Sequence, residues 1–580
     1  MKNREISEIF SEIADILELK GDNAFRIRAY RTAGQNIINL DRQISDIYKE
    51  KGMEGLCDIH GIGKDLAEKI VEMIQTGVLK HHQELLKEFS PGFLGLLNIS
   101  GIGPKKLKQL RDELNVNTVD DIEKACKNGS LETLDGMGEK SRDKLLEAIQ
   151  YYKQQLGKTL LVKGEKLADE LIAYLSESYY FEKLEKAGSL RRGQETIGDI
   201  DILAVTSNVE EAVDYFTRYR GAQQILSKGR LMVSIILKEG IQADLRLIEK
   251  SSFGAGLVYF TGSKSHNIKL RKIAKNKGLK VNEYGVFKVN DVTGEDELVS
   301  SKKEEDIYAS LGMEWIPPEL REDTGEIELA LAGKIPKDLV ELEDIKGDLH
   351  IHSTASDGRN SIEENIESAV ARGYKYIALT DHSKLIKIAH GMDETRLLEH
   401  VGYIRKIAAK RKDIKILAGI EVDILTDGTL DLADYALKEL DIVIASVHSK
   451  FLLEENIQTE RIMRALDNPY VNILAHPSGR IITSRTPMQI DFERLFKHAV
   501  ARGVYLEINT HGERVDLNDK NARRAKELGA KFVINTDAHD TGQMDLMKFG
   551  IKTARRAWLS KDDIINTKTI NELLRILKRK

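Results

Sequence analysis

The sequence contains little cysteine, no long apolar run and no large excess of either charge. Only Cys57 and Cys126 occur among its 580 residues, and they do not form a CxxC pair. This excludes a disulfide-stabilised scaffold and predicts a reducing compartment, the cytoplasm. No apolar run approaches the ~20 residues that a membrane helix needs, so no membrane partner is expected. A formal net charge of −5 is also unlike that of a protein that only coats nucleic acid.

The length and residue balance are typical of a soluble protein with several domains. A chain of 580 residues is expected to contain about four domains. A content of 41% hydrophobic and 31% charged residues is an ordinary globular composition. The histidines are unevenly distributed, because ten of the 14 lie between His350 and His539. The C-terminal part is therefore expected to have a chemistry of its own.

Residues 1–150 have helical periodicity, interrupted by three short glycine hairpins. Backbone N–H groups at such a Gly-x-Gly turn can bind a DNA phosphate without reading the base. The residues predicted to contact DNA are Gly61, Gly63 and Lys64, then Gly101, Gly103 and Lys105, together with Arg26 and Tyr30 of the basic segment 25–31. The third hairpin, residues 135–140, is the weakest candidate. The alternatives are plain helix–helix turns for the hairpins and a solvated helix face for the basic segment.

Two aspartates follow a glycine-serine turn near the middle of the chain. The turn reads Gly-Ser-Leu-Arg-Arg-Gly at 188–193, and Gly-Asp-Ile-Asp-Ile-Leu follows at 198–203. In a strand, Asp199 and Asp201 point to one face, where two carboxylates can bind Mg²⁺. The alternating run 241–248 places Asp244 on a neighbouring strand, as a two-metal nucleotidyl-transfer site requires. The alternative is an edge strand with solvated aspartates.

With further motifs, residues 1–318 resemble the family X DNA polymerases. The motifs are GSLRRG, GDIDI, ADLRLI, YFTGS, the spacing of Asn267 and Arg271, and VNEYG. The resemblance implies that Asp199 and Asp201 bind two Mg²⁺ (or Mn²⁺) ions and that Asp244 binds the catalytic one. It also implies that the nucleotide is held by Gly188, Ser189, Arg192, Gly198, Tyr259, Phe260, Gly262, Asn267 and Arg271.

The resemblance also implies a lyase residue. Lys69 matches the family's Schiff-base lysine, which removes deoxyribose phosphate; a surface lysine on a DNA-facing helix is the alternative. Arg26 and His81 replace lysines of the family's 5′-phosphate pocket, and Gln242 replaces an arginine that orients the third carboxylate. The first two departures bear on the lyase activity, and the third bears on the turnover of nucleotide addition.

After an acidic connector at 319–346, apolar strand-like runs alternate with helical patterns. This alternation predicts a parallel sheet, closed as a barrel, with its chemistry at the C-terminal ends of the strands. Those ends carry histidines and carboxylates, a mixture that suits Zn²⁺, Mn²⁺ or Fe²⁺. The cluster resembles the polymerase-and-histidinol-phosphatase (PHP) domain. The resemblance implies up to three metals on nine ligands: His350, His352, Asp357, His382, Glu421, His448, His476, Asp537 and His539.

Four more residues of this region carry weaker interpretations. Asn509, Arg514 and Arg480 are hypothesised to contact a phosphate, whereas His400 is interpreted as an ordinary residue.

Three metals at a barrel mouth suit phosphoester hydrolysis, because they activate water and neutralise the phosphate.

The sequence therefore predicts a multi-domain α/β protein. The expected parts are a helical domain with a helix-hairpin-helix (1–90), a second helical domain with further hairpins (91–155), a mixed α+β nucleotidyltransferase palm (156–255), a thumb-like subdomain (256–318), a linker (319–346) and a PHP-type (β/α) barrel (347–580). The predicted function is gap-filling DNA synthesis in repair, acting as a monomer on gapped or nicked DNA and dNTPs. By resemblance, the barrel adds a 3′→5′ exonuclease, a 3′-phosphoesterase and cleavage at abasic sites. The alternatives are a fused small-molecule phosphatase and a non-catalytic scaffold.

Overall fold

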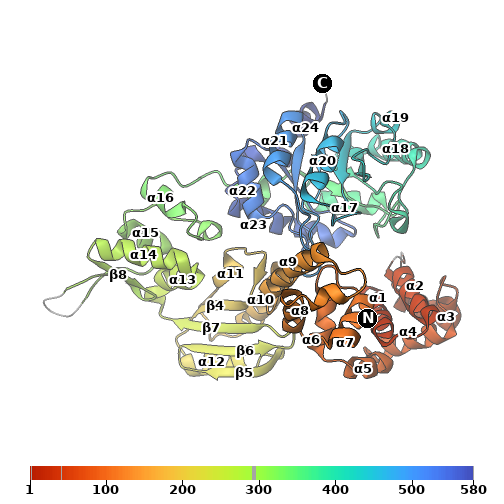
Figure 1. The fold of residues 1–580 in the computed structure, drawn as a ribbon. Coiled ribbons are helices and arrows are strands. Elements are labelled where there is room, and N and C mark those ends of the chain that lie inside the picture. Colours follow the sequence, from red (N-terminus) through yellow and green to blue (C-terminus); the bar gives the residue numbers. More distant parts are fainter. Residues whose placement is uncertain (2, 39, 41, 291–295, 579–580) are drawn as a thin grey trace.

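The computed structural model describes residues 1, 3–38, 40, 42–290 and 296–578. Figure 1 shows a helical N-terminal part, a palm built on a sheet, a thumb that projects to one side and a barrel above the palm and the helices. Within the described chain, no helix combines the length and the apolar character needed to cross a membrane.

The N-terminal part consists of helices around two apolar cores. The first core includes Phe10 and Ile70, and the second includes Leu107 and Ile149. The helices are α1 (Asn3–Lys20), α2 (Ala24–Ile38), α3 (Ile44–Cys57), α4 (Lys64–Thr76), α5 (Lys80–Lys87), α6 (Pro91–Gly95), α7 (Pro104–Leu114), α8 (Val119–Lys127) and α9 (Glu139–Gln155). The helical periodicity of this region is thus confirmed, since apolar residues three and four apart line one face of each helix.

The three glycine hairpins share one backbone design. The first glycine of each, Gly61, Gly101 or Gly136, has a φ between 74° and 85°, a region that L side chains rarely adopt. The apolar residue that follows is buried in each hairpin. The second glycine is exposed and precedes the first residue of the next helix. By backbone alone, the third hairpin is therefore equivalent to the other two.

The palm is a five-stranded sheet in the order β2-β4-β7-β6-β5. Its elements are α10 (Leu161–Ser176), β2 (Lys183–Lys186), α11 (Gly188–Arg191), β4 (Asp199–Val205), α12 (Val209–Thr217), β5 (Ala222–Lys228), β6 (Met232–Leu237) and β7 (Gln242–Ile248), with a short pair β1 (Thr159–Leu160) and β3 (Thr196–Ile197). The three predicted strands are β4, β6 and β7. The edge strands β2 and β5 were missed, because neither has a buried, alternating apolar face.

The thumb has its own apolar core, and residues 319–346 contribute to it. Its elements are α13 (Phe253–Thr261), α14 (Lys264–Asn276), β8 (Leu279–Asn282), β9 (Gly285–Lys288), β10 (Glu297–Ser300) and α15 (Glu304–Ser310). The expected connector contains one short helix, α16 (Glu326–Leu331). However, Leu320, Ile327 and Leu339 of this segment lie in the thumb core. The segment therefore does more than link two domains.

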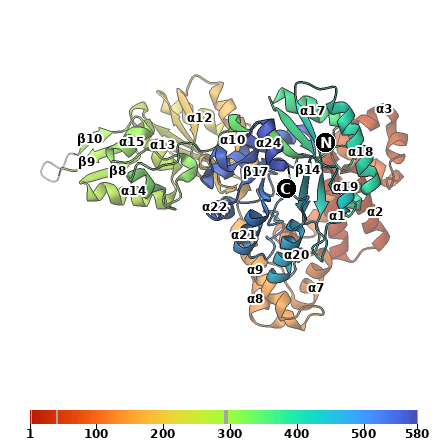
Figure 2. The ribbon, with the colours of Figure 1, turned by 90° about the horizontal axis from the view of Figure 1, so that it is seen from above.

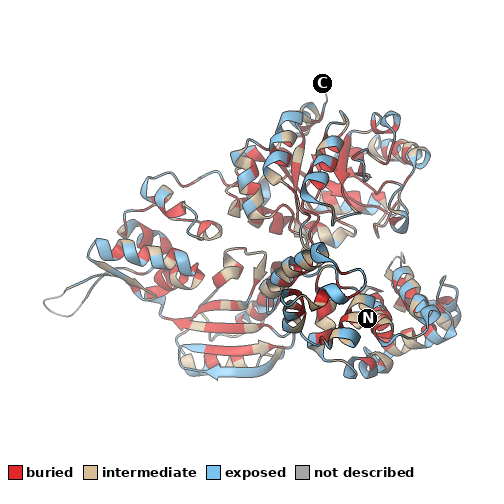
Figure 3. Cartoon of the chain, in the orientation of Figure 1, coloured by how far each residue is buried: buried red, intermediate tan, exposed pale blue. Residues whose placement is uncertain are grey.

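The C-terminal part is a nearly closed barrel of seven parallel strands in sequence order. The strands are β11 (Gly347–Ile351), β12 (Tyr376–Leu379), β13 (Lys415–Asp423), β14 (Ile442–Ser446), β15 (Ile473–Leu474), β16 (Tyr505–Asn509) and β17 (Phe532–Asn535). A parallel bridge between Ile351 and Ala538 brings the first strand beside the last. The residues of these strands are all buried apart from the first residue of β13 and the first residue of β16. Figure 3 shows the buried strands in red. The predicted barrel is confirmed.

Helices surround these strands (Figure 2). They are α17 (Ile362–Ala371), α18 (Glu394–Ala408), α19 (Asp434–Leu437), α20 (Glu455–Leu466), α21 (Phe492–Arg502), α22 (Asp519–Glu527), α23 (Met547–Arg556) and α24 (Ile570–Leu577). Helix α23 packs on two domains, because its Met547 and Ile551 lie in the barrel core whereas its Phe549, 4% exposed, lies in the apolar core of the palm. Trp558, just after this helix, packs against the thumb core. The barrel is thus joined to both polymerase-like parts.

Candidate active sites

The three carboxylates of the palm are brought together by the parallel pairing of β4 and β7. Asp201 lies directly opposite Asp244 in this register, and Asp199 shares its face one pleat earlier. One oxygen of each carboxylate lies within 4.8 Å of the others. The Gln242 amide donates to Asp244 Oδ1 at 2.9 Å, so it still orients the third carboxylate. The structure thus groups the three residues that strand alternation indicated.

Arg246 supplies a cation to this group. Its Nε lies 3.3 Å from Asp201 Oδ1 and its Nη2 3.4 Å from Asp244 Oδ2. Its guanidinium also lies 4.7 Å from the centre of the Phe260 ring. Burial, followed by the charge of Asp199, raises the pKa of Asp201 to about 6. Three partly buried carboxylates share the single positive charge of Arg246. The remaining negative charge favours binding of a divalent cation.

Helix α11 holds the turn that is predicted to bind phosphate against these carboxylates. Gly188 has a φ of 60°, and a Cβ built there would lie 2.3 Å from Asp201 Oδ2, so the close approach requires glycine. Arg191 faces the thumb, where it pairs with Glu304 and donates to Thr261 Oγ1. The first arginine of the turn therefore ties palm to thumb, and the second, Arg192, donates to Glu322 and to the carbonyl of Thr261.

Ser189, Arg192 and Gly198 line a cavity of about 740 Å³ between the palm and the barrel. Arg192 Nε donates to Glu322 Oε1 at 2.9 Å, and the opposite wall includes Arg556 of α23. A cavity of this size is ample for a nucleotide, since ligand pockets span about 300–1,000 Å³. These three predicted nucleotide-binding residues therefore face one common space.

The other predicted nucleotide-binding residues lie where α13 ends and α14 begins. They are Tyr259, Phe260, Gly262, Asn267 and Arg271. The amide of Asn267 donates to the carbonyl of Tyr259 at 2.7 Å, and the two aromatic rings meet edge to face. Arg271 is exposed. The structure places this set beside the palm rather than around the cavity.

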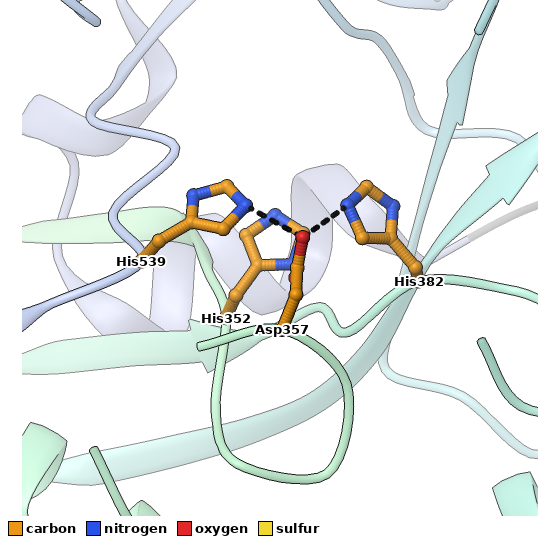
Figure 4. A group of neighbouring side chains, drawn as sticks. All are labelled: His352, Asp357, His382 and His539. Atoms are coloured by element: carbon orange, nitrogen blue, oxygen red, sulfur yellow. Dashed lines mark ion pairs between the residues drawn. The ribbon is translucent and has the colours of Figure 1, made fainter. Parts of the chain in front are cut away.

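Eight of the nine predicted barrel ligands form three groups, each with ligand atoms within 4.8 Å of one another. The groups are His352, Asp357, His382 and His539 (Figure 4); His350, His352 and Asp537; and His382, Glu421 and His448. His352 and His382 each belong to two groups, so the three are adjacent. The ninth residue, His476, lies beside them with its Nε2 3.0 Å from Glu421 Oε1. Strand ends therefore converge as the barrel pattern predicted.

Three buried nitrogens, and the neutral form of one imidazole, fit metal ligation in this cluster. His350 Nε2, His352 Nδ1 and His476 Nδ1 are buried and have no hydrogen-bond partner among the described residues. Burial and the neighbouring His539 and His382 lower the pKa of His352 to about 4, so its imidazole is neutral at pH 7. A neutral imidazole with an unpaired buried nitrogen is the form that coordinates a metal.

Two buried carboxylates support these ligands, and neither was singled out from the sequence. Glu507 lies 2.8 Å from His350 Nδ1 and accepts the N–H of His476. Asp381 accepts hydrogen bonds from Ser353 and Ser356, and His400 Nε2 lies 3.1 Å from it. His400, expected to be ordinary, is thus part of the support. The available signal was that Asp381 follows β12 directly and that Glu507 lies within the apolar strand β16.

The three hypothesised phosphate contacts have different positions. Asn509 donates to Asp537 Oδ2 at 3.0 Å, and Arg514 Nε lies 3.9 Å from the same carboxylate. Arg480 does not face the metal groups: it forms a bidentate ion pair with Glu195 of the palm at 3.2 and 2.5 Å. Arg480 is thus paired across the domain interface, and its contact with a phosphate stays a prediction.

Comparisons with known proteins identify the helical, thumb and barrel parts of the chain. Residues 256–322 match the DNA polymerase beta thumb family, residues 1–79 and 93–150 match helix-hairpin-helix families, and residues 348–511 match the PHP domain. The DNA polymerase/3′-5′ exonuclease PolX of Bacillus subtilis (strain 168) is 37% identical over 581 residues, which cover 100% of both chains. The chain belongs to the PolX family. The barrel alone is 33% identical to probable phosphatases of Thermoanaerobacter sp. (strain X514) and Thermoanaerobacter pseudethanolicus, over 40% of this chain and 96% of theirs.

In this PolX-family chain, the predicted lyase residue lies in a small polar cluster of the first helical domain. Lys69 pairs with Asp65 at 2.5 Å, and its side chain is 17% exposed. Arg26 Nη2 lies 3.2 Å from His81 Nε2. Burial, followed by the charges of Arg26 and Lys69, lowers the pKa of His81. The helices thus assemble a basic site from residues that are far apart in sequence.

Tyr30 belongs to the core of the same domain. Its ring packs edge to face on Phe10 with centroids 5.4 Å apart, and the residue is 1% exposed. Only its hydroxyl, which has no hydrogen-bond partner among the described residues, is oriented toward the Lys69 cluster. The prediction that Tyr30 lies on a DNA-facing surface is therefore corrected: α2 turns the aromatic side chain inward.

The two hairpins that are predicted to bind DNA have different surroundings. Gly61, Gly63 and Lys64 are exposed. Gly101 of the second hairpin instead lines a cavity of about 310 Å³ that is shared with Phe451 of the barrel. The second hairpin, with the exposed Lys105, thus reaches solvent next to the barrel domain.

Proposed function

We propose that this chain is a DNA-directed DNA polymerase that fills short gaps, joined to a 3′→5′ exonuclease. The observation that carries the proposal is the triad of Asp199, Asp201 and Asp244, against which Gly188 of the glycine-serine turn packs. This oxygen-only donor set fits Mg²⁺ or Mn²⁺, which when bound neutralise the phosphates and activate the primer 3′-hydroxyl. Asp244, oriented by Gln242, is the carboxylate proposed to accept the proton of that hydroxyl.

The palm and thumb residues have proposed roles in placing the nucleotide. Ser189, Arg192 and the Gly198 backbone bind the triphosphate. Tyr259 and Phe260 lie against the sugar. Asn267 contacts the base and Arg271 the template strand. The full-length likeness to the Bacillus subtilis PolX supports this assignment.

The barrel is proposed to trim 3′ ends. Its three adjacent groups of histidine and carboxylate fit Mn²⁺, Zn²⁺ or Fe²⁺, and the unpaired nitrogens of buried His350, His352 and His476 favour such ions. Metals bound there would activate water for attack on a phosphodiester. Cleavage at abasic sites by the barrel, and lyase chemistry at Lys69, belong to the same proposal. The chain is proposed to act as a monomer in the cytoplasm on gapped or nicked DNA.

Assays on gapped, 3′-labelled DNA test this function. With dNTPs and Mg²⁺ the labelled strand should lengthen, and without dNTPs in Mn²⁺ it should shorten. A protein that does neither, although it is loaded with metal, would contradict the proposal.

A second candidate activity for the barrel is small-molecule phosphomonoester hydrolysis. The similarity of the barrel to two probable phosphatases favours this activity. Turnover of histidinol phosphate can be compared with that of single-stranded DNA. Faster turnover of the small phosphate would favour this candidate over the exonuclease.

A further inference from the structure

Helix α23 of the barrel lies directly against the predicted triphosphate-binding turn. Phe549 is buried in the palm core, one turn before Lys552. A Cβ built on Gly193, which follows Arg192, would lie 3.1 Å from the Cβ of Lys552. The barrel therefore packs against the back of the turn without an intervening layer.

Arg556 is the last residue of α23, and its side chain is 6% exposed. Its Nη1 donates to the backbone carbonyl of Arg192 and to Glu322 Oε1, each at 3.0 Å. Its other edge, Nε and Nη2, donates to Asp519 Oδ2 at 2.9 and 2.7 Å. One guanidinium of the barrel thus contacts the palm, the thumb segment and its own domain.

Glu322 Oε1 is shared between two arginines. Besides Arg556, it accepts from Arg192 Nε at 2.9 Å and from the Gln194 amide at 2.5 Å. Arg192 must leave Glu322 if its guanidinium is to bind a triphosphate. Leaving a partly buried carboxylate without a cation raises the free energy of the folded protein. With Arg556 in place, Glu322 keeps a charged partner; without it, only the neutral amide of Gln194 would remain.

The barrel holds the next part of the same turn as well. Arg480 forms a bidentate pair with Glu195, and its own side chain is 4% exposed. Residues 192–195 are thus clamped from two points of the barrel. The geometry ties this segment of the palm to a domain that carries a different active site.

We propose that Arg556 is a positioning residue for nucleotide addition, which retains Glu322 when Arg192 moves to the triphosphate. This inference rests on the proposed polymerase function. It makes the barrel a working part of the nucleotide pocket, independent of the barrel's own hydrolytic chemistry. The ligand class is the polyphosphate tail of a deoxynucleoside triphosphate.

Single-nucleotide addition on gapped DNA tests the role of Arg556. In Arg556→Gln the KM for the dNTP should rise about tenfold, as expected for one charge-assisted hydrogen bond, while kcat stays within twofold. Arg556→Lys keeps the positive charge but loses the planar set of guanidinium donors, so the KM should rise less than in Arg556→Gln. Adding Glu322→Gln to Arg556→Gln removes the stranded charge and should return the KM to within about twofold of wild type.

A neighbouring interdomain arginine supplies the control. Among the described residues, Arg555 pairs with Glu319 at 2.8 Å and with Glu341 and has no hydrogen bond or ion pair to residues 188–195, so Arg555→Gln should leave the KM unchanged. DNA affinity and exonuclease rate report whether the variants are folded. An unchanged KM in Arg556→Gln, a parallel fall of kcat and exonuclease rate, or no rescue by Glu322→Gln would each overturn the inference. A wild-type chain that adds no nucleotide would instead refute the proposed function.

Discussion

Replacing Glu304 by glutamine is expected to destabilise the junction of palm and thumb. Glu304 accepts two hydrogen bonds from Arg191 of the palm at 2.8 Å and one from Arg321 at 2.7 Å. Arg321 is completely buried, and Glu304 is 7% exposed. Glu304→Gln removes the charge that both guanidinium groups share, and an unpaired buried cation is strongly unfavourable.

The magnitude follows from the pKa of Glu304. Burial would raise it, but the charge of Arg321 and the hydrogen bonds of Arg191 and Arg321 outweigh burial and lower it from 4.5 to about 2. At ~1.36 kcal/mol per pH unit, the carboxylate contributes about 3 kcal/mol. Because the folded pKa is lowered, this contribution is fully present above pH ~4.5 and is lost as the pH falls toward 2. Wild type and Glu304→Gln should therefore differ by about 3 kcal/mol at pH 7 and converge in acid.

Tryptophan fluorescence gives a local assay. The chain has two tryptophans, and both Trp315 and Trp558 pack against the thumb core. In a urea titration at pH 7, Glu304→Gln should lower the midpoint by about 1–3 M. The matched control is Glu305→Gln, the same change at an exposed neighbour. A midpoint for Glu304→Gln equal to that of the control, or a difference from wild type that does not shrink toward pH 3, would refute this reasoning.

The remaining predictions separate the sites. Asp201→Asn should lower nucleotide addition by at least ~10³-fold and leave exonuclease activity intact, because the two metal sites share no ligand; primer extension and 3′-label release measure both. His352→Ala should do the reverse and reduce bound metal, measured by elemental analysis; loss of both activities in either variant would contradict two separate sites. Lys69→Ala should abolish borohydride trapping of abasic-site DNA without changing synthesis, and trapping that persists would remove Lys69 from the lyase proposal.

Periodicity was sufficient for the parts of the sites that lie on regular strands. Asp199, Asp201 and Asp244 could be grouped in advance because strand residues two apart share a face and because the two runs were recognisable as strands. The strand–helix alternation likewise indicated that histidines and carboxylates gather at one edge of the barrel, since parallel strands end there. The set of nine ligands rested on the resemblance to the PHP domain.

The contacts that were missed depend on long-range packing. Tyr30 stands in a basic segment, and only the angle between α1 and α2 turns it onto Phe10. Arg480 and Glu195 are 285 residues apart, so no local pattern could pair them. The edge strand β5 has exposed apolar residues and no alternation. Such features follow from how domains dock, which a single sequence does not encode in its periodicity.

The place of Phe549 has a consequence for the order of biosynthesis. The palm core runs from Leu161 to Leu247, but one of its members is supplied by a helix near the carboxyl terminus. At ~5–20 residues per second, the ribosome needs roughly 15–60 s to make the intervening segment of about 300 residues. During that time the nascent palm carries an open apolar site. The apolar core of the palm is therefore completed only after most of the barrel has been translated.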